Sequence, residues 1–313
     1  MNTDYDIIIV GGGPGGLTAG LYGARAELKT ILLEKYLPGG QIAVTEEVED
    51  YPGFEMISGA ELASKMADHA TKFGLEIKSE EVEEVYCRGD VRVVKTVERE
   101  LTAKAVILAT GGSPNKLNVP GEQQFTGKGV SYCAICDGAF FKGEVIAVVG
   151  GGDAAVEEGL FLTKFGSKVV LIHRRDELRA QKIIQTRAFN NSKMEFIWDT
   201  VVEEIQGDTK VKSLSLQNVK TGEKSSLDVG AVFIFVGFVP NSNLVREAIR
   251  KDQGGYIITD DTMQTSVPGI FAIGDVRAQL VRQITNAVGD GTTAAVAAEK
   301  HIERLHDKEL TVK

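Results

Sequence analysis

The chain of 313 residues is predicted to fold as an α/β protein of two domains built on parallel sheets. Its length is about twice that of a common single domain. Residues 6–10 (DIIIV) form an apolar, β-branched run, which is typical of a strand buried on both faces of a parallel sheet. A glycine-rich turn, a small-residue helix over 17–27 and a second apolar strand over 30–34 follow. The same order returns at residues 145–173.

The two segments also share their spacing. Twenty-three positions separate Gly11 from Glu34, and twenty-three separate Gly150 from His173. A strand, a glycine turn, a helix and a strand in about thirty residues form the βαβ unit that binds a dinucleotide. The sequence therefore predicts two Rossmann-like dinucleotide-binding domains of the three-layer type.

The second domain is predicted to be inserted in the first. Apolar strands that end in glycine close each repeat at 105–112 and 231–241, and a third such strand at 269–275 precedes a small-residue helix over 289–302. Because this last part has no second half of its own, we expect residues 1–115 and 242–313 to form one discontinuous domain and residues 116–241 the other. Segments 76–103 and 195–228 alternate apolar and polar residues, which predicts a small antiparallel sheet on each domain.

Composition excludes several classes of protein. Asp and Glu number 44 against 35 Lys and Arg, a net charge of −9, the wrong sign for binding nucleic acid or an anionic membrane. The longest apolar run, at 231–239, is too short to cross a bilayer, and the first residues, MNTDYD, are acidic where a signal peptide is basic. We therefore expect a cytoplasmic protein. Three unevenly spaced cysteines argue against a structural disulfide framework.

The first glycine turn fits FAD or NAD(H). Gly11, Gly13 and Gly16 occupy the positions where a side chain would block the tight turn, the pyrophosphate and the helix packing. The helix N-terminus beneath offers free N–H groups to phosphate. Glu34 ends the second strand, where a carboxylate accepts hydrogen bonds from a ribose 2′-hydroxyl and repels a 2′-phosphate.

The second turn is predicted to bind NADPH. It carries Gly150, Gly152 and Ala155, and His173 stands in the place of Glu34. A group of arginines follows, and guanidinium groups make bidentate, permanently charged contacts with phosphate. The members of this group are Arg174, Arg175 and Arg179. The alternative is a solvated basic start of a helix.

Cys133 and Cys136 form a CxxC pair just before the second turn. Such pairs close a disulfide within one helical turn and have one thiol of depressed pKa. Half of a zinc site and two buried thiols are the alternatives, but the chain has no second close cysteine pair and only four histidines. Asp137 is an acid within reach of a thiolate, or a helix N-cap. Cys87 is expected to be a spectator.

Two nucleotide sites and a dithiol form a complete electron path. Hydride transfer from NADPH does not readily reduce a disulfide to a dithiol unless a flavin carries the electrons between them. The first site is therefore expected to hold FAD. A protein that only senses nucleotide and redox state through the thiol pair is the alternative outside enzymes.

The motifs together resemble those of the low-molecular-weight bacterial thioredoxin reductases across essentially the whole chain. They are GGGPGG at 11–16, GGQ at 39–41, EDYPG at 49–53, ATG at 109–111, CAICD at 133–137, GGGDAAVEE at 150–158, HRRDELRA at 173–180, GDV at 274–276 and RQI at 282–284. The resemblance implies a homodimeric oxidoreductase and flavoprotein that uses NADPH and FAD to reduce the disulfide of thioredoxin or a thioredoxin-like protein. It also implies that Cys136 meets the flavin, Cys133 attacks thioredoxin and Asp137 donates a proton.

The resemblance and the two turns give a set of expected cofactor contacts. Asp50 departs from the asparagine usual in the family, and an ionised carboxylate accepts but cannot donate a hydrogen bond. The expected FAD residues are Gly11, Gly12, Gly13, Pro14, Gly15, Gly16, Glu34, Lys35, Gly40, Gln41, Asp50, Val82, Gly111, Gly274, Asp275, Arg282, Gln283 and Ile284. The expected NADPH residues are Gly150, Gly152, Asp153, Ala154, Ala155, His173, Arg174, Arg175 and Arg179.

The resemblance also implies a movement. The dithiol and the nicotinamide site belong to the inserted domain and both need the reactive face of the flavin, so we expect this domain to rotate on linkers near 113–119 and 241–244. Flavin-dependent dithiol oxidases and ferredoxin-fed reductases are the nearest alternatives, but those relatives tend to lose the arginine group. Alkyl hydroperoxide reductase flavoproteins carry extra N-terminal domains, and the glutathione-reductase class places its dithiol close after the first turn.

Overall fold

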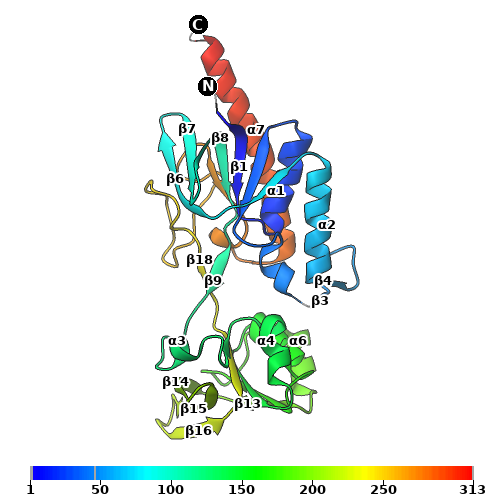
Figure 1. Cartoon of the computed structure of the whole chain (residues 1–313), viewed down its shortest axis with the longest axis vertical. Helices are drawn as coiled ribbons and strands as arrows, with labels where there is room; N and C mark the ends of the chain where they lie inside the picture. Colours follow the sequence, from blue (N-terminus) through cyan, green and yellow to red (C-terminus); the bar gives the residue numbers. More distant parts are fainter. Residues whose placement is uncertain (1–2, 46, 312–313) are drawn as a thin grey trace. The chain divides into compact units, whose positions relative to one another are not determined.

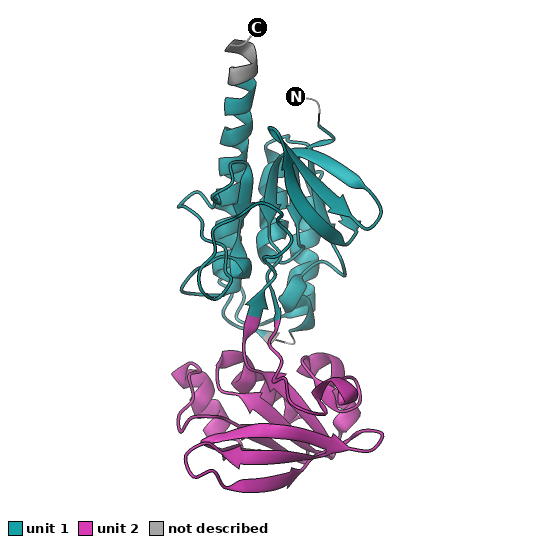
Figure 2. Ribbon diagram, turned by 90° about the vertical axis from the view of Figure 1, so that its left-hand side faces the viewer, with its two compact units in different colours: residues 1–113, 239–313 teal, residues 114–238 magenta. Residues whose placement is uncertain are grey.

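The computed structural model describes residues 3–45 and 47–311 and divides the chain into two compact units. Unit 1 comprises residues 1–113 and 239–313, and unit 2 comprises residues 114–238 (Figures 1 and 2). The chain passes between them twice, through β9 (Gly112–Pro114) and β18 (Phe238–Pro240), and these two short strands pair with each other. The crossing points lie two to three residues from the predicted boundaries. Among the described residues, no helix is long and apolar enough to cross a membrane.

Unit 1 is built on a seven-stranded mixed sheet in the order β5-β2-β1-β8-β7-β6, with β19 paired to β8. The parallel core forms because β1 and β2 are continuous apolar runs, and Ile7, Ile8 and Ile9 are fully buried. Its strands are β1 (Tyr5–Val10), β2 (Thr30–Glu34), β5 (Glu76–Ser79), β6 (Val82–Arg88), β7 (Val91–Thr96), β8 (Glu100–Leu108) and β19 (Ile270–Ala272), and β3 (Glu47–Val48) and β4 (Ile57–Ser58) form a separate pair.

Alternate residues of the unit 1 strands face two different layers. Ile7 and Ile9 pack with the helices, of which α1 and α2 lie side by side in Figure 1. Ile8 and Val10 pack instead with Val85 and other residues of the antiparallel strands and of segment 244–257. The helices are α1 (Pro14–Arg25), α2 (Gly59–Lys72) and α7 (Ile284–Thr311), with short 3-10 turns η1 (Gly40–Val44) and η3 (Gly274–Val276).

Unit 2 repeats this design around a five-stranded parallel sheet in the order β10-β17-β11-β12-β13. Ile146 and Val148 face the helices, and the alternate residues Ala147 and Val149 face the antiparallel strands. The parallel strands are β10 (Val130–Ser131), β11 (Val145–Gly150), β12 (Lys168–Ile172), β13 (Met194–Ile197) and β17 (Ala231–Phe235). The other elements are α3 (Glu122–Phe125), α4 (Ala134–Asp137), η2 (Gly138–Phe141), α5 (Asp153–Leu162), α6 (Lys182–Phe189), and the antiparallel strands β14 (Thr200–Gly207), β15 (Val211–Asn218) and β16 (Lys224–Asp228).

The predicted antiparallel segments differ from the structure in detail. Segment 76–103 was expected to form a small separate sheet, but β5 pairs with β2 in parallel and β8 pairs with β7 at one end and with β1 and β19 at the other. The long strand β8 therefore joins both parts of unit 1 into one sheet. In unit 2, residues 195–197 belong to β13 of the parallel sheet, and only β14 to β16 form the separate antiparallel sheet.

Candidate active site

The first glycine turn lies at the carboxyl end of β1. Gly11 has φ +106°, and a Cβ there would lie 2.3 Å from the carbonyl oxygen of Ala109, so both conformation and space require glycine. A Cβ on Gly13 would instead meet open space. Gly13 is the N-cap of α1, and no side chain caps that helix end. The first N–H groups of α1 thus face an open position suited to a phosphate.

Glu34 ends β2 beside this turn. Its Oε2 accepts a hydrogen bond from the Gly12 N–H at 2.6 Å, and its Oε1 accepts one from the Tyr36 N–H at 2.9 Å. These bonds fix the carboxylate next to the second glycine, where its remaining lone pairs can accept from a ribose hydroxyl. The position and chemistry of Glu34 therefore fit a dinucleotide without a 2′-phosphate.

Several other predicted FAD residues gather at the same end of the unit 1 sheet. The Gly39 N–H donates to the Gly12 carbonyl at 2.7 Å, and a Cβ on Gly40 would lie 3.1 Å from the Gly13 Cα. The loop that carries Gly40 and Gln41 is thus packed against the glycine turn. Gly111 follows the carboxyl end of β8, Gly274 and Asp275 follow β19, and Arg282, Gln283 and Ile284 lead into α7.

A buried ion pair holds the turn after β19. Asp290 on α7 is 7 % exposed, and it accepts hydrogen bonds from the Gly274 N–H and from Arg277 Nη1, both at 3.0 Å. Burial raises the pKa of Asp275, against the opposing effect of the positive charge of Arg282, and Asp290 raises it further. Sequence reasoning missed Asp290 and Arg277; an acid within a helix of small residues is the signal that could have found them.

The remaining predicted FAD residues lie at the edge of this group. Lys35 forms an exposed ion pair with Glu81 at 2.6 Å, and Val82 follows directly in β6. The Glu80 N–H donates to the Glu34 carbonyl at 3.0 Å, which brings this strand entry beside Glu34. Asp50 lies exposed in the loop between β3 and β4. Among the described residues, no hydrogen bond ties its carboxylate to the glycine turn.

The second glycine turn lies at the carboxyl end of β11 and is tied to the arginine loop. The Arg179 N–H donates to the Gly151 carbonyl at 2.7 Å, and the Gln181 N–H donates to Asp153 Oδ1 at 2.7 Å. A Cβ on Gly152, the N-cap of α5, would meet open space, as at Gly13. The two hydrogen bonds place the whole loop next to the turn.

The arginine loop leaves its charges available. Arg174, Arg175 and Arg179 are exposed, and within the part of the chain that the structure describes no carboxylate lies within ion-pair distance of them. The nearby acids Asp176 and Asp199 instead form ion pairs with Lys220, whose Nζ lies 2.8 and 3.0 Å from their carboxylate oxygens. The three guanidinium groups therefore remain free for an anionic ligand such as a 2′-phosphate.

His173 is buried at the end of β12, with 5 % of its surface exposed. A Cβ on Gly151 would lie 2.2 Å from its Cε1, so the imidazole ring covers the second glycine of the turn. Burial lowers the pKa of His173, and the positive charges of Arg179, Arg175 and Arg174 lower it further. The ring is neutral at neutral pH and its Nε2 lacks a partner within the described structure.

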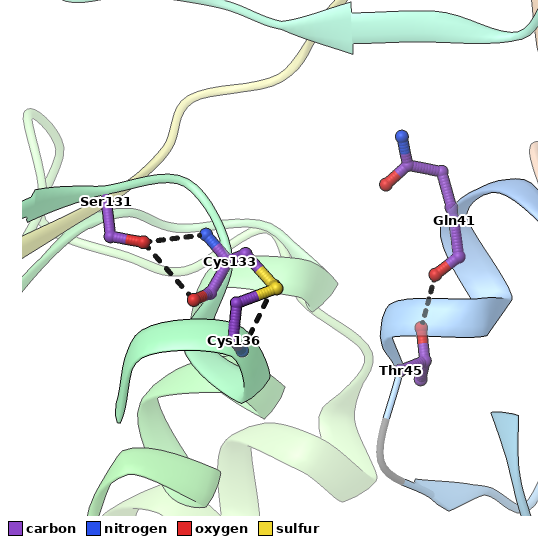
Figure 3. Close-up of a disulfide and its surroundings, with 5 residues drawn as sticks. All are labelled: Gln41, Thr45, Ser131, Cys133 and Cys136. Carbon is purple, nitrogen blue, oxygen red and sulfur yellow. Dashed lines mark hydrogen bonds between the residues drawn. A yellow bond between two sulfur atoms is a disulfide. The ribbon is translucent and has the colours of Figure 1, made fainter. Parts of the chain in front are cut away.

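Cys133 and Cys136 form a disulfide in unit 2 (Figure 3). Cys133 is the N-cap of α4, and its Sγ accepts a hydrogen bond from the Cys136 N–H at 3.2 Å. The Ser131 Oγ accepts from the Cys133 N–H at 3.1 Å and donates to the Cys133 carbonyl at 3.2 Å. Cys133 is half-buried, whereas Cys136 is exposed. The short helix thus carries a disulfide whose backbone is held by hydrogen bonds.

Two other predictions concern the neighbours of this pair. Asp137 ends α4 and occupies the N-cap position of η2, where its side chain makes no capping hydrogen bond. Its role as an acid near a thiolate stays a prediction. Cys87 lies half-buried in β6, where burial raises its thiol pKa. Among the described residues, no group of three or more His, Cys, Asp or Glu side chains is arranged to hold a metal ion.

Comparisons with known proteins decide the family. The model of the pyridine nucleotide-disulphide oxidoreductase family matches residues 5–291. The chain belongs to this family. The thioredoxin reductase of Bacillus subtilis (strain 168) is 49 % identical over 310 residues, covering 99 % of this chain and 98 % of the relative. The thioredoxin reductase structure of Lactococcus lactis in the FR conformation is 50 % identical, with a TM-score of 0.94, covering 96 % of this chain and all of that one.

A ferredoxin-flavin thioredoxin reductase from Clostridium acetobutylicum is more distant. It is 31 % identical with a TM-score of 0.53, covering 97 % of this chain and 98 % of that one. As a pyridine nucleotide-disulphide oxidoreductase, the chain has the fold class that the two glycine turns predicted, and the predicted resemblance to thioredoxin reductases is confirmed. The family name also agrees with the two features of unit 2, a nucleotide turn and a disulfide.

Proposed function

We propose that this chain is an NADPH-dependent thioredoxin reductase. The observation that carries the proposal is the Cys133–Cys136 disulfide in the same unit as a dinucleotide turn flanked by three exposed arginines. Electrons pass from NADPH to FAD, then to the Cys133–Cys136 pair, and finally to the disulfide of thioredoxin or a thioredoxin-like protein.

Unit 1 holds FAD at the carboxyl end of its parallel strands. The N–H groups at the start of α1 would bind the pyrophosphate, Glu34 would accept from the adenosine ribose, and the turn at Gly274 and Asp275 would hold the other half of the cofactor. The flavin supplies hydride acceptance from NADPH and electron transfer to a disulfide. The protein supplies the binding contacts and the orientation.

Unit 2 holds NADPH at the second turn. The start of α5 faces the pyrophosphate, and Arg174, Arg175 and Arg179 bind the 2′-phosphate. His173 places a neutral ring at the position where unit 1 has a carboxylate, and this ring packs against Gly151. A 2′-phosphate would be repelled by an acid such as Glu34 at the same place.

The dithiol completes the reaction by two exchange steps. The Cys133 thiolate attacks one sulfur of the thioredoxin disulfide and releases the other as a thiolate, which takes a proton from Asp137. Cys136 then attacks the mixed disulfide at Cys133, which restores the Cys133–Cys136 disulfide and releases reduced thioredoxin. Cys136 is also the sulfur that meets the flavin. Asp137 is adjacent to Cys136 at the end of α4.

The two half-reactions require movement of the units. The dithiol and the nicotinamide site both belong to unit 2, and both need one face of the flavin, so unit 2 turns between half-reactions. The linkers near 113–119 and 241–244, which adjoin the crossing strands β9 and β18, are its hinges. We further propose that the enzyme is a cytoplasmic homodimer, as the resemblance implies, and that it binds neither nucleic acid nor membrane, which its net charge of −9 supports.

A turnover assay with NADPH, NADH and oxidised thioredoxins tests this function. NADPH should be consumed only when a thioredoxin disulfide is present, whereas a nucleotide sensor would consume none and a dithiol oxidase would act without NADPH. Cys133→Ser and Cys136→Ser should each abolish thioredoxin reduction and leave the bound flavin reducible by NADPH. Cys87→Ser is the matched control and should retain wild-type activity. Loss of activity in Cys87→Ser would contradict the proposed electron path.

A further inference from the structure

Glu122 is a buried carboxylate that the reaction described above does not use. It is the first residue of α3 and is 3 % exposed. Its Oε1 accepts hydrogen bonds from the Leu117 N–H at 2.9 Å and from the Tyr132 hydroxyl at 2.7 Å, and its Oε2 accepts one from the Asn118 N–H at 2.6 Å. A buried carboxylate is costly unless donors surround it. Three donors converge on this one, and among the described residues no cation forms an ion pair with it.

The three donors come from two functionally distinct segments. Leu117 and Asn118 lie in the stretch that follows β9, by which the chain enters unit 2. Asn118 has φ +59°, a left-handed conformation that non-glycine residues rarely adopt. The bond from its N–H to Glu122, four residues further on, therefore holds Asn118 in this conformation. Tyr132 comes from the other segment, directly before Cys133.

Ser131 and Tyr132 precede the disulfide, and hydrogen bonds hold both side chains. Ser131 is 4 % exposed in β10, and its hydroxyl bonds to both the N–H and the carbonyl of Cys133. Tyr132 is half-buried, and burial together with the neighbouring Glu122 carboxylate raises the pKa of its hydroxyl well above the usual range. Tyr132 therefore remains a hydrogen-bond donor at every working pH. The Glu122–Tyr132 bond is the link from this held segment to the entry stretch.

We propose that Glu122 and Tyr132 are positioning residues that hold Cys133 in the conformation that forms the disulfide. The role of the pair in thioredoxin reduction rests on the proposed function, whereas its redox equilibrium does not. The equilibrium constant for closing a disulfide rises in proportion to the fraction of time in which the two sulfurs lie within bonding reach. Without the Tyr132 hydroxyl, the Tyr132–Cys133 backbone samples conformations in which the sulfurs are further apart. The open dithiol is then favoured, and Cys136 re-forms the disulfide more slowly.

The test is Tyr132→Phe in the full-length flavoprotein. The fraction of oxidised Cys133–Cys136 is measured at fixed ratios of oxidised to reduced dithiothreitol, by thiol alkylation and mass spectrometry. Loss of one hydrogen bond should shift the equilibrium toward the dithiol by between about two- and tenfold. Steady-state thioredoxin reduction should slow by a similar factor, while flavin reduction by NADPH in stopped-flow measurements stays at the wild-type rate.

Tyr86→Phe is the matched control. Tyr86 also donates to a glutamate, Glu100, at 2.7 Å, but this bond lies on the exposed side of the antiparallel strands of unit 1. It should leave both the dithiol equilibrium and thioredoxin reduction unchanged. Glu122→Gln serves as a second variant if Tyr132→Phe fails to fold, and it should shift the equilibrium in the same direction, because an amide cannot accept from all three donors.

Two results would overturn the proposal. One is an unchanged dithiothreitol equilibrium in Tyr132→Phe. The other is an equal fall in flavin reduction by NADPH, which would indicate general damage to unit 2. A wild-type protein that fails to reduce any thioredoxin would contradict the proposed function, and the dithiothreitol equilibrium would still test the positioning role separately.

Discussion

The two βαβ units share one backbone frame and differ at the end of the second strand. In unit 1, Glu34 lies against Gly12 and accepts its N–H at 2.6 Å. In unit 2, the His173 ring lies against Gly151, and three exposed arginines follow. In both, the side chain at the strand end covers the second glycine of the turn. The same frame fits a dinucleotide in both units, and under the proposed function the residues just past the second strand select FAD or NADPH.

A second difference lies where the helix passes the strand. A Cβ on Gly16 would lie 2.0 Å from the Gly11 carbonyl oxygen. The equivalent residue in unit 2 is Ala155, whose methyl group is accommodated and fully buried. The helix α1 therefore approaches its strand more closely than α5 does. Unit 1 also adds β19 and the Gly274 turn, held by Asp290, to its nucleotide site.

The largest expected effect comes from exchanging these helix positions. Gly16→Ala should destabilise unit 1 by about 3 kcal/mol or more, because the added methyl meets backbone that cannot move aside. The purified protein should lose FAD. Ala155→Gly, the counterpart in unit 2, should cost only about 1 kcal/mol of helix stability. Urea unfolding and the flavin-to-protein absorbance ratio measure both, and equal losses in the two variants would contradict the difference in helix approach.

The next effect concerns the arginine loop. Replacing Arg174 and Arg175 by Gln should raise the KM for NADPH by between about ten- and one-hundredfold, since hydrogen bonds to charged groups contribute about 1.5–3 kcal/mol. Turnover with NADH should barely change. Lys168→Gln is the control, because Lys168 begins the same strand at its opposite end. A wild-type enzyme that uses both nucleotides equally would refute the assignment of this loop.

A smaller effect is expected at the matching place in unit 1. Glu34→Gln removes the charged acceptor beside Gly12 and should weaken FAD binding by about tenfold. The KM for NADPH should stay unchanged, because Glu34 belongs to the other unit. Titration of the apoprotein with FAD, followed by flavin fluorescence, gives the affinity. Glu83→Gln is the control, since it removes an exposed carboxylate of β6 that pairs with Lys95; an equal loss of FAD affinity there would show that only net charge matters.

The smallest effect is a pH dependence that His173 gives to unit 2. The folded protein holds the pKa of His173 below the ordinary value of about 6.5. As pH falls below 6.5, the unfolded chain therefore takes up a proton that the folded chain does not, and stability decreases. In urea unfolding between pH 7.5 and 5.5, the free energy of unfolding should decrease less steeply with falling pH in His173→Gln than in the wild type. Identical slopes would show that His173 titrates normally in the folded state.

Much of the fold could be predicted because the repeat has a strong local pattern. Apolar runs before Gly11 and Gly150, with equal spacing to Glu34 and His173, locate both βαβ units without tertiary information. The pairing of β5 with β2 could not be predicted, because residues 76–79 alternate like an antiparallel strand although they complete the parallel sheet. Alternation reports which faces are buried, not which strand lies alongside.

The candidate site divides in the same way. The glycines, the CxxC pair and the arginine loop have sequence signatures because their chemistry depends on residues that are near in the chain. Glu122 and Asp290 have none, because most of their donors are backbone N–H groups, which residues of any type supply. A single acid in a sequence is usually a surface residue. Its role as a buried acceptor appears only with the donors in place.

The most direct test of the central claim is the affinity of the protein for adenosine 2′,5′-bisphosphate and for adenosine 5′-monophosphate. Trp198 is the only tryptophan, and its ring centroid lies 6.5 Å from that of His173, so its fluorescence reports binding at the second turn. The wild type should bind the bisphosphate at least tenfold more tightly, and the Arg174→Gln, Arg175→Gln variant should lose most of that preference. Equal affinity of the wild type for the two nucleotides would contradict the claim that residues past the second strand select the cofactor.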